Sequence, residues 1–268
     1  MLFSGGRGSG ALARQLVARP GVSLTVAING YDDGASTGEV RRFLGDSLGP
    51  SDFRKNASRL AGELQTASSL LIELLDARLP AVVSTADAVA EIRRTAADPA
   101  HDRRINDWLT AFIEEHTRSG TPFAFGDCSL GNLVFAGAYL RAGRDFNRAV
   151  DDYTALLGLP AGLIENVTSG RDAWLVALTA SGQLVSSEEA IVDARNQSTI
   201  RSIFLIDKPL TEAEAKTIGA LGADAAATAL KRASRRWRSI RASRRGSPRR
   251  TSSSTHRAPS TRACFRPT

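Results

Sequence analysis

Cysteine and histidine are scarce in this chain of 268 residues. The two cysteines, Cys128 and Cys264, are too few and too far apart for a disulfide framework, which favours a reducing compartment. The three histidines, His101, His116 and His256, show none of the spacings of a zinc site. No apolar run reaches the roughly 20 residues that span a membrane, and no signal peptide is evident. We therefore expect a cytoplasmic protein without a membrane partner.

Acidic residues are absent from the last part of the chain. From Lys231 onward there are 13 Lys or Arg residues and no acid, whereas 22 basic and 28 acidic residues give residues 1–230 a formal charge of −6. The net charge of +7 therefore comes from the tail alone. The tail also lacks hydrophobic periodicity and is rich in Arg, Ser and Pro. We predict a folded domain over residues 1–230 and a basic, low-complexity, disordered tail over residues 231–268.

The order of apolar and polar segments predicts a parallel sheet. A short apolar start, a glycine-rich loop, a helix over residues 11–18 and a strand over residues 22–28 form the opening of a βαβ unit. Further segments are expected as helices over residues 52–78, 84–118, 131–140, 145–157 and 212–230, a hairpin of residues 173–178 with 183–186, and a strand over residues 199–206. The sequence thus predicts an α/β fold, in which the charged residues 84–118 form a helical insertion.

The first loop contains Gly6-Arg7-Gly8-Ser9-Gly10 and leads directly into a helix. It is neither a Walker P-loop nor a complete dinucleotide fingerprint. Glycines still allow the backbone to approach a ligand closely, and a helix N-terminus points free N–H groups at it. The loop therefore suits a phosphate or diphosphate, although a tight strand–helix turn without a ligand would use the same glycines.

The second loop, residues 29–38, reads NGYDDGASTG and follows the strand predicted over residues 22–28. Since both strands are expected to be parallel, the two loops should leave the same carboxyl edge of the sheet, where ligands bind in open α/β sheets. Asp32 and Asp33 could hold a magnesium ion, orient a hydroxyl group or accept its proton. An Asx-rich surface turn is the plain alternative.

A third polar stretch, GPSDFRKN at residues 49–56, opens the next helix. Ser51 or Asp52 is a suitable N-cap, which would be a purely structural role. Arg54 and Lys55 lie one turn inside the helix, where a cationic side chain could neutralise a phosphate.

A fourth stretch, FGDCSLGNL at residues 125–133, places polar residues before an apolar helix. Cys128 lies in it without an evident histidine partner. A thiol needs such a base or a lowered pKa to act as a nucleophile, so we do not assign Cys128 that role.

In this order, FSGGRGSG, NGYDDGASTG, GPSDFRKN and GDCSLGNL resemble the motifs of the 2-phospho-L-lactate transferase (CofD-type) family and of its gluconeogenesis-factor (YvcK-type) relatives. The resemblance covers about residues 2–229 and is weakest over residues 79–120. It implies a Rossmann-like three-layer α/β sandwich with a mainly parallel sheet. The transferases move a phospholactyl or related group from a guanosine diphosphate-type donor to the hydroxyl of a deazaflavin, using magnesium, in the synthesis of a deazaflavin coenzyme. The relatives bind a UDP-sugar and influence cell-envelope metabolism.

The resemblance therefore implies a CofD-like transferase with a nucleotide-linked donor, a hydroxyl acceptor and magnesium. The alternative is a non-catalytic UDP-sugar-binding protein that regulates cell-envelope or carbon metabolism. Asp32 and Asp33 would be catalytic and hold the metal. The substrate-binding positions carried over by motif are Gly5, Gly6, Gly8 and Gly10 at the donor phosphates, and Ser36, Asp52, Arg54, Asn56, Asp127 and Asn132 along the same cleft.

This chain departs from the family pattern at two places. Arg7 stands where many relatives carry Thr, and Asn29-Gly30-Tyr31 precedes the two aspartates in place of a short apolar or Thr-containing segment. The resemblance therefore does not identify the donor or the acceptor of this chain. A homodimer is compatible with the sequence.

The tail departs more strongly, because the family continues with a buried strand and a second glycine loop. Back-translated with permitted wobble choices, residues 246–268 read IAEADVVVYAPGTQHSSLLPSY in a second frame, which contains a strand and a Pro-Gly-Thr loop of the missing kind. We therefore hypothesise a frameshift between about residues 228 and 246. The alternatives are a nucleic-acid-binding arm, because dense Arg runs bind phosphate backbones, and a solvated low-complexity tail.

Overall fold

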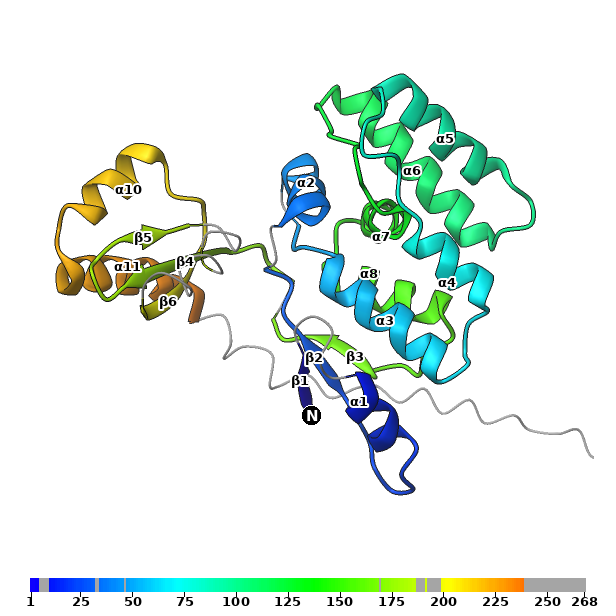
Figure 1. The fold of residues 1–268 in the computed structure, drawn as a ribbon, viewed down its shortest axis with the longest axis horizontal. Helices are drawn as coiled ribbons and strands as arrows, with labels where there is room; N and C mark the ends of the chain where they lie inside the picture. Colours follow the sequence, from blue (N-terminus) through cyan, green and yellow to red (C-terminus); the bar gives the residue numbers. More distant parts are fainter. Residues whose placement is uncertain are drawn as a thin grey trace, which may run out of the picture.

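The fold is taken from a computed structural model, which describes residues 1–4, 10–31, 34–45, 47–168, 170–186, 191 and 199–238. Figure 1 shows a parallel sheet, helices packed beside it, and a separate antiparallel sheet with helices of its own. The predicted α/β class is thus confirmed as a mixed α/β architecture, while the three-layer sandwich stays a prediction. No helix in the described ranges combines the length and apolar character needed to cross a membrane.

The parallel sheet has the strand order β1-β2-β3. β1 spans Leu2–Ser4, β2 Val26–Ile28 and β3 Ile164–Asn166, and all three end in register, with Ser4 beside Ile28 and Ile28 beside Asn166. β2 is the central strand and all of its residues are buried. The segments that follow the three strands therefore leave from one edge of the sheet, as the sequence predicts for the first two.

β3 was not predicted from the sequence. It is three residues long and contains Glu165 and Asn166, so it has neither an apolar run nor a clear alternation. It joins the sheet because the N–H of Val26 donates to the carbonyl of Leu163 at 2.6 Å and the N–H of Val167 donates to the carbonyl of Ile28 at 3.1 Å. Such pairing depends on contacts between distant parts of the chain, which a local pattern does not contain.

The first helices follow the two loops. α1 spans Gly10–Val17, α2 Ala35–Leu44, α3 Ser51–Glu63 and α4 Ser69–Asp76. The single helix expected over residues 52–78 is therefore two helices. Gln65 has a φ of 57°, which ends α3, and the hydroxyl of Ser68 accepts the N–H of Leu71 and caps α4. α3 begins at Ser51 with Pro50 at the N-cap, one residue earlier than expected.

The helical insertion consists of α5, Thr85–Ala97, and α6, Arg103–Ser119. It packs on α7, Leu130–Arg141, which is buried on nearly all sides and is followed by α8, Phe146–Leu156. Figure 1 shows α7 end-on between α2, α6 and α8. α7 therefore connects the insertion with the helices that cover the parallel sheet.

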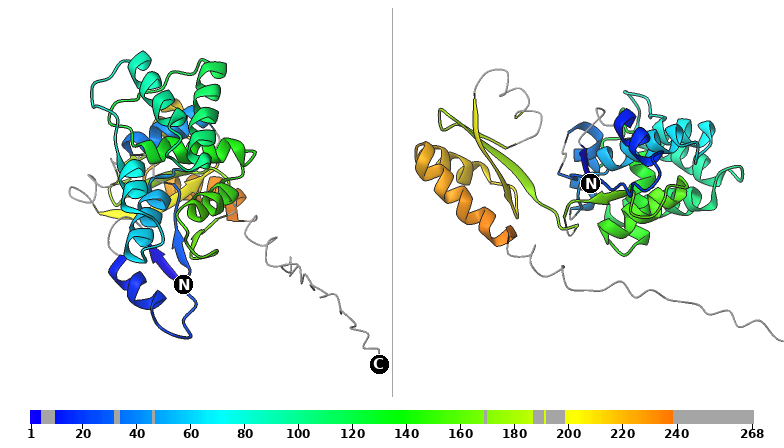
Figure 2. Two further views of the ribbon diagram at one scale, coloured as in Figure 1. Left: turned by 90° about the vertical axis from the view of Figure 1, so that its right-hand side faces the viewer. Right: turned by 90° about the horizontal axis from the view of Figure 1, so that it is seen from below.

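The antiparallel sheet has the order β5-β4-β6, with β4 at Trp174–Thr179, β5 at Leu184–Val185 and β6 at Ile200–Ile206. It confirms the predicted hairpin and the strand that follows it. α10, Glu212–Gly219, and α11, Ala223–Arg238, cover one face (Figure 2). The helix expected over residues 212–230 is divided at Gly222, where φ is 75°, and α11 runs past the predicted domain boundary. Phe204 and Leu230 belong to a small core of this part.

Candidate functional site

The first contact of the candidate site lies where the chain leaves β1. Ser4, the last residue of β1, donates its hydroxyl to Oδ1 of Asn56 at 3.2 Å, and both side chains are buried. Asn56 in turn donates from Nδ2 to the carbonyl of Asp52 at 2.8 Å. The N-terminal half of α3 is thereby attached to the start of the first glycine loop. Of the predicted site residues, Gly5, Gly6, Gly8, Asp32 and Asp33 lie outside the described residues.

The loop after β2 contacts the start of the third motif. The carbonyl of Gly30 accepts the N–H of Gly49 at 2.5 Å. A Cβ at Gly30 would lie 2.9 Å from Cβ of Leu48 and 3.1 Å from the ring of Phe53, so a larger residue would push the two segments apart. Gly30 of the second motif is therefore explained by packing, because glycine permits this close approach of the two segments.

A series of hydrogen bonds, buried at Arg54 and Asn132, joins the second, third and fourth motifs. Arg54 is 4% exposed and donates from Nε to Oδ1 of Asn132 at 3.0 Å. Asn132 is 1% exposed and donates from Nδ2 to the hydroxyl of Ser36 at 2.9 Å. At its other end the guanidinium of Arg54 forms an ion pair with Asp76 at the end of α4. Ser36, Arg54 and Asn132 were all predicted as site residues, and the fold brings them together.

Gly131 explains how Arg54 reaches its partner. A Cβ at Gly131 would lie 2.5 Å from Cδ of Arg54, 2.5 Å from the carbonyl oxygen of Leu75 and 3.1 Å from the hydroxyl of Tyr153. The glycine of the fourth motif thus provides the passage for the arginine side chain of the third motif.

Gly10, the described glycine of the first motif, also has a packing role. It is the first residue of α1 and is buried, and a Cβ there would lie 2.5 Å from Cδ of Arg59 and 3.1 Å from Oε1 of Glu63. α1 therefore approaches α3 closely at its N-terminus. This packing on α3 accounts for the glycine at position 10, and its predicted role at a donor phosphate stays a prediction.

Asp127 lies apart from this series of hydrogen bonds. Its carboxylate is 63% exposed and pairs with Nε of Arg78 at 2.7 Å and Nη2 at 2.9 Å. Asp127 has a φ of 54°, and its N–H donates to the carbonyl of Pro80. The hydrogen bonds from Arg78 hold the pKa of Asp127 below its ordinary value. Asp127 is therefore an ionised residue at the surface turn that precedes α7.

Cys128 fits the sequence interpretation that it is not a nucleophile. The side chain is buried, and burial raises the pKa of its thiol to about 12. At neutral pH the thiol is protonated and enclosed by the core, whereas a reactive cysteine needs a thiolate in an accessible, electropositive place.

Comparison with known proteins identifies the family. The family model described as 2-phospho-L-lactate transferase CofD matches residues 1–230. The chain belongs to the CofD family. No curated protein matches the sequence. The crystal structure of protein BH3568 from Bacillus halodurans is similar, with a TM-score of 0.50 and 23% identity over 79% of this chain and 53% of that chain. That likeness concerns the fold alone, and this chain spans about half the length of the Bacillus protein.

The motif residues do not exhaust the polar groups around the candidate site. Arg41 in α2 is 3% exposed and bonds to the segments that follow β2 and β3, which the sequence interpretation missed. The spacing contains a signal for it: Arg41 lies four residues after Thr37 and three before Leu44, which places the three side chains on one face of a helix. A helical face that is otherwise buried therefore contains a cation, which requires partners.

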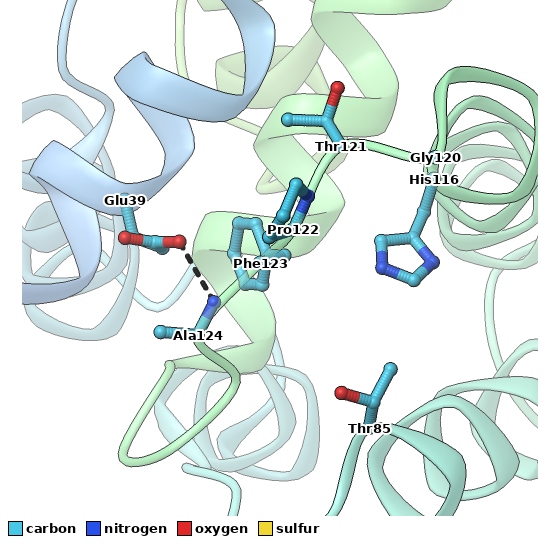
Figure 3. Close-up of a pocket in the computed structure, with 8 residues that line it drawn as sticks. All are labelled: Glu39, Thr85, His116, Gly120, Thr121, Pro122, Phe123 and Ala124. Carbon is cyan, nitrogen blue, oxygen red and sulfur yellow. Dashed lines mark hydrogen bonds between the residues drawn. The ribbon is translucent and has the colours of Figure 1, made fainter.

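A cavity of about 500 Å³ is lined by residues of α2, α5, the end of α6 and the segment that precedes α7. Figure 3 shows Glu39 of α2 accepting the N–H of Ala124 at 2.8 Å, while the rings of His116 and Phe123 and the side chain of Thr85 contribute to the wall. The ring of His116 is stacked on Phe112 and also contacts the rings of Phe43 and Phe125. Glu39 thus connects α2 to the same segment that leads into Asp127.

Proposed function

We propose that the chain is a transferase that moves a phospholactyl-type group from a nucleotide diphosphate-linked donor to a hydroxyl acceptor such as a deazaflavin. One observation carries the proposal. Residues from three of the four CofD motifs are joined by hydrogen bonds, from Ser36 through Asn132 to Arg54, and Ser36 lies in the first turn of the helix that follows β2 at the carboxyl edge of the parallel sheet. Open α/β sheets bind their ligands at that edge.

The glycines Gly5, Gly6, Gly8 and Gly10 would face the donor phosphates. The reaction forms a bond between the acceptor oxygen and the phosphorus that carries the lactyl group, and it breaks the diphosphate bridge, so that a nucleoside monophosphate leaves. Asp32 or Asp33 would take the proton of the acceptor hydroxyl. Positioning and charge neutralisation supply most of the catalysis of such phosphoryl transfers.

Arg54 and Asn132 would support the site from behind rather than bind the donor through the guanidinium. The guanidinium is buried, and its bonds go to Asn132, to Asp76 and to the carbonyl of Leu75. Asn132 passes this constraint to Ser36 in the first turn of α2. The N-terminus of α2, which follows the two aspartates in the sequence, would thereby be held in one orientation.

Magnesium is part of the proposal, and the two aspartate carboxylates are suitable ligands for it. Among the described residues there is no group of three His, Cys, Asp or Glu side chains that could form a metal cage. Magnesium is commonly bound by one or two carboxylates together with substrate phosphates, so Asp32 and Asp33 are sufficient protein ligands. When bound, the ion would neutralise charge on the diphosphate. Asp32 and Asp33 would hold it, and the glycine loop would orient the donor against them.

The test is product formation from lactyl-diphospho-guanosine and the deazaflavin acceptor by the purified protein with magnesium, followed by chromatography. We expect turnover that requires magnesium and that falls by at least about a hundredfold in Asp32→Asn and Asp33→Asn. Asp107→Asn, in the exposed face of α6, is the matched control and should keep the activity. Thermal stabilisation by UDP-sugars in the absence of any turnover would contradict the transferase and support the non-catalytic alternative.

A further inference from the structure

Arg41 is a buried cation in a helix face that otherwise packs in the core. Thr37, Val40 and Leu44 lie on the same side of α2, and all are at most 6% exposed. Arg41 itself is 3% exposed. A buried charge is costly unless hydrogen bonds and an opposite charge satisfy it, so the contacts of Arg41 must contribute substantially to the local structure.

The guanidinium of Arg41 joins two segments that leave the sheet. Nη1 donates to the carbonyl of Tyr31, after β2, at 2.9 Å. Nη2 donates to Oδ1 of Asp172 at 2.7 Å and to the carbonyl of Ala173 at 2.8 Å, both after β3. The planar fork of arginine can direct several donors at once in fixed directions, which the single ammonium of lysine cannot do.

A third contact reaches the antiparallel sheet. The guanidinium carbon of Arg41 lies 4.7 Å from the ring centroid of Trp174, the first residue of β4. This distance is typical of a cation–π interaction. Arg41 therefore connects α2 with Tyr31 after β2, with the segment after β3 and with the beginning of β4.

The contact with Tyr31 lies immediately before the two aspartates in the sequence. The N–H of Tyr31 donates to Oδ1 of Asn29 at 3.1 Å, so the chain turns just before the carbonyl that Arg41 holds. On the other side, Gly34 is the N-cap of α2 with φ −73° and ψ 145°. Tyr31 and Gly34, the described residues on either side of the two aspartates in the sequence, are thus both attached to α2.

We infer that Arg41 is a positioning residue for the aspartate loop, because it holds the backbone at Tyr31 against Asp172 and Ala173. This inference rests on the proposed function, in which Asp32 and Asp33 hold magnesium. The relation is indirect: Arg41 acts through the backbone that carries the carboxylates. Loss of its guanidinium releases the backbone at Tyr31 and weakens binding of a magnesium–nucleotide complex.

The experiment compares Arg41→Met and Arg41→Lys with Arg42→Met in the full chain. Arg42 is the matched control, because its side chain is 62% exposed and its ion pair goes to Glu39 within the same helix. Backbone amide hydrogen exchange is measured over peptides that cover residues 29–34 and 171–174. Binding of magnesium with guanosine diphosphate is measured by calorimetry.

We expect exchange in both peptides to accelerate by at least about tenfold in Arg41→Met, with an intermediate effect in Arg41→Lys. Affinity for the magnesium–nucleotide complex should fall by about 10- to 100-fold, as it does when residues behind metal ligands are lost. Arg42→Met should match the wild type in both measurements.

Unchanged exchange in Arg41→Met would overturn the inference, and so would faster exchange with an unchanged nucleotide affinity. If the wild-type chain binds no magnesium–nucleotide complex, the proposed function fails instead. The exchange data alone then decide whether Arg41 holds the backbone at Tyr31.

Discussion

Arg54 and Asn132 share a buried hydrogen bond of 3.0 Å although 78 residues separate them in the sequence. The bond connects the helix of the third CofD motif with the helix of the fourth. Asn132 uses its amide in both directions, accepting from Arg54 and donating to Ser36. Two motifs that are separated by the whole helical insertion therefore meet through one side chain.

Asn132→Ala is expected to lower the free energy of unfolding by about 1–3 kcal/mol, because it leaves the buried Nε of Arg54 without an acceptor. Asn132→Asp keeps the acceptor for Arg54 and loses the donor to Ser36. Urea denaturation should therefore rank the wild type above Asn132→Asp and Asn132→Asp above Asn132→Ala. Equal stability of the two variants would show that the bond to Arg54 does not matter.

Gly137 allows α6 and α7 to pack backbone against backbone. A Cβ at this position would overlap the carbonyl oxygen of Trp108 in α6. We expect Gly137→Ala to destabilise the protein by about 1–3 kcal/mol or more, since backbone atoms would have to move apart. Gly219→Ala is the control, because nothing lies within 4 Å of its Cβ position in α10. Thermal unfolding should show a lower Tm only for the first variant.

Cys128 is expected to be inert in the native protein. In a Cys264→Ser background, Ellman's reagent at mildly alkaline pH should not react until guanidinium chloride unfolds the chain, because burial raises the pKa of the thiol to about 12. The raised pKa contributes stability that is present below the ordinary thiol pKa of about 9 and is lost as the pH rises towards 12. Rapid reaction of the folded protein would contradict this assignment.

Glu214 is expected to make the stability of α10 depend on acid pH. The backbone N–H of Thr211, and then the side chains of Lys208 and Thr211, lower the pKa of Glu214 to about 2. A lowered pKa gives stability that is present above the ordinary value of 4.5 and is lost as the pH falls towards 2. The difference in urea midpoint between the wild type and Glu214→Gln should therefore shrink between these pH values. A constant difference would argue against the capping carboxylate.

The frameshift hypothesis predicts a different end of the chain. In the described part of the sheet, β1 is an edge strand and its residue Phe3 is 73% exposed, which is unusual in a parallel sheet. Nucleotide sequencing across the codons for residues 225–268 should reveal a single-base slip that restores the Pro-Gly-Thr loop. A chain with the restored frame should aggregate less. An intact frame would contradict the hypothesis and call for a salt-dependent nucleic-acid binding assay of the tail.

The sequence by itself determined the parallel βαβ start, the helical character of the segments other than α2, and the four polar motifs, whereas residues 29–38, expected as a loop, end in the first residues of α2. These features depend on local chemistry: glycines in turns, caps before helices and apolar periodicity. The sequence did not predict the division of residues 52–78 into α3 and α4, because the break depends on the backbone of Gln65 and the cap at Ser68. The predicted roles of Asp32, Asp33 and the first glycines stay predictions.

Only the tertiary structure decided which of the motif residues meet. It joined Ser36, Arg54 and Asn132, left Asp127 with Arg78, and gave Arg41 a place between two loops and Trp174. It also added β3, whose three residues become a strand by pairing with β2. Most of these contacts join residues that are far apart in the sequence. Those of Arg41, Arg54 and Asn132 form because burial makes every unpaired polar group costly, which a linear pattern cannot express.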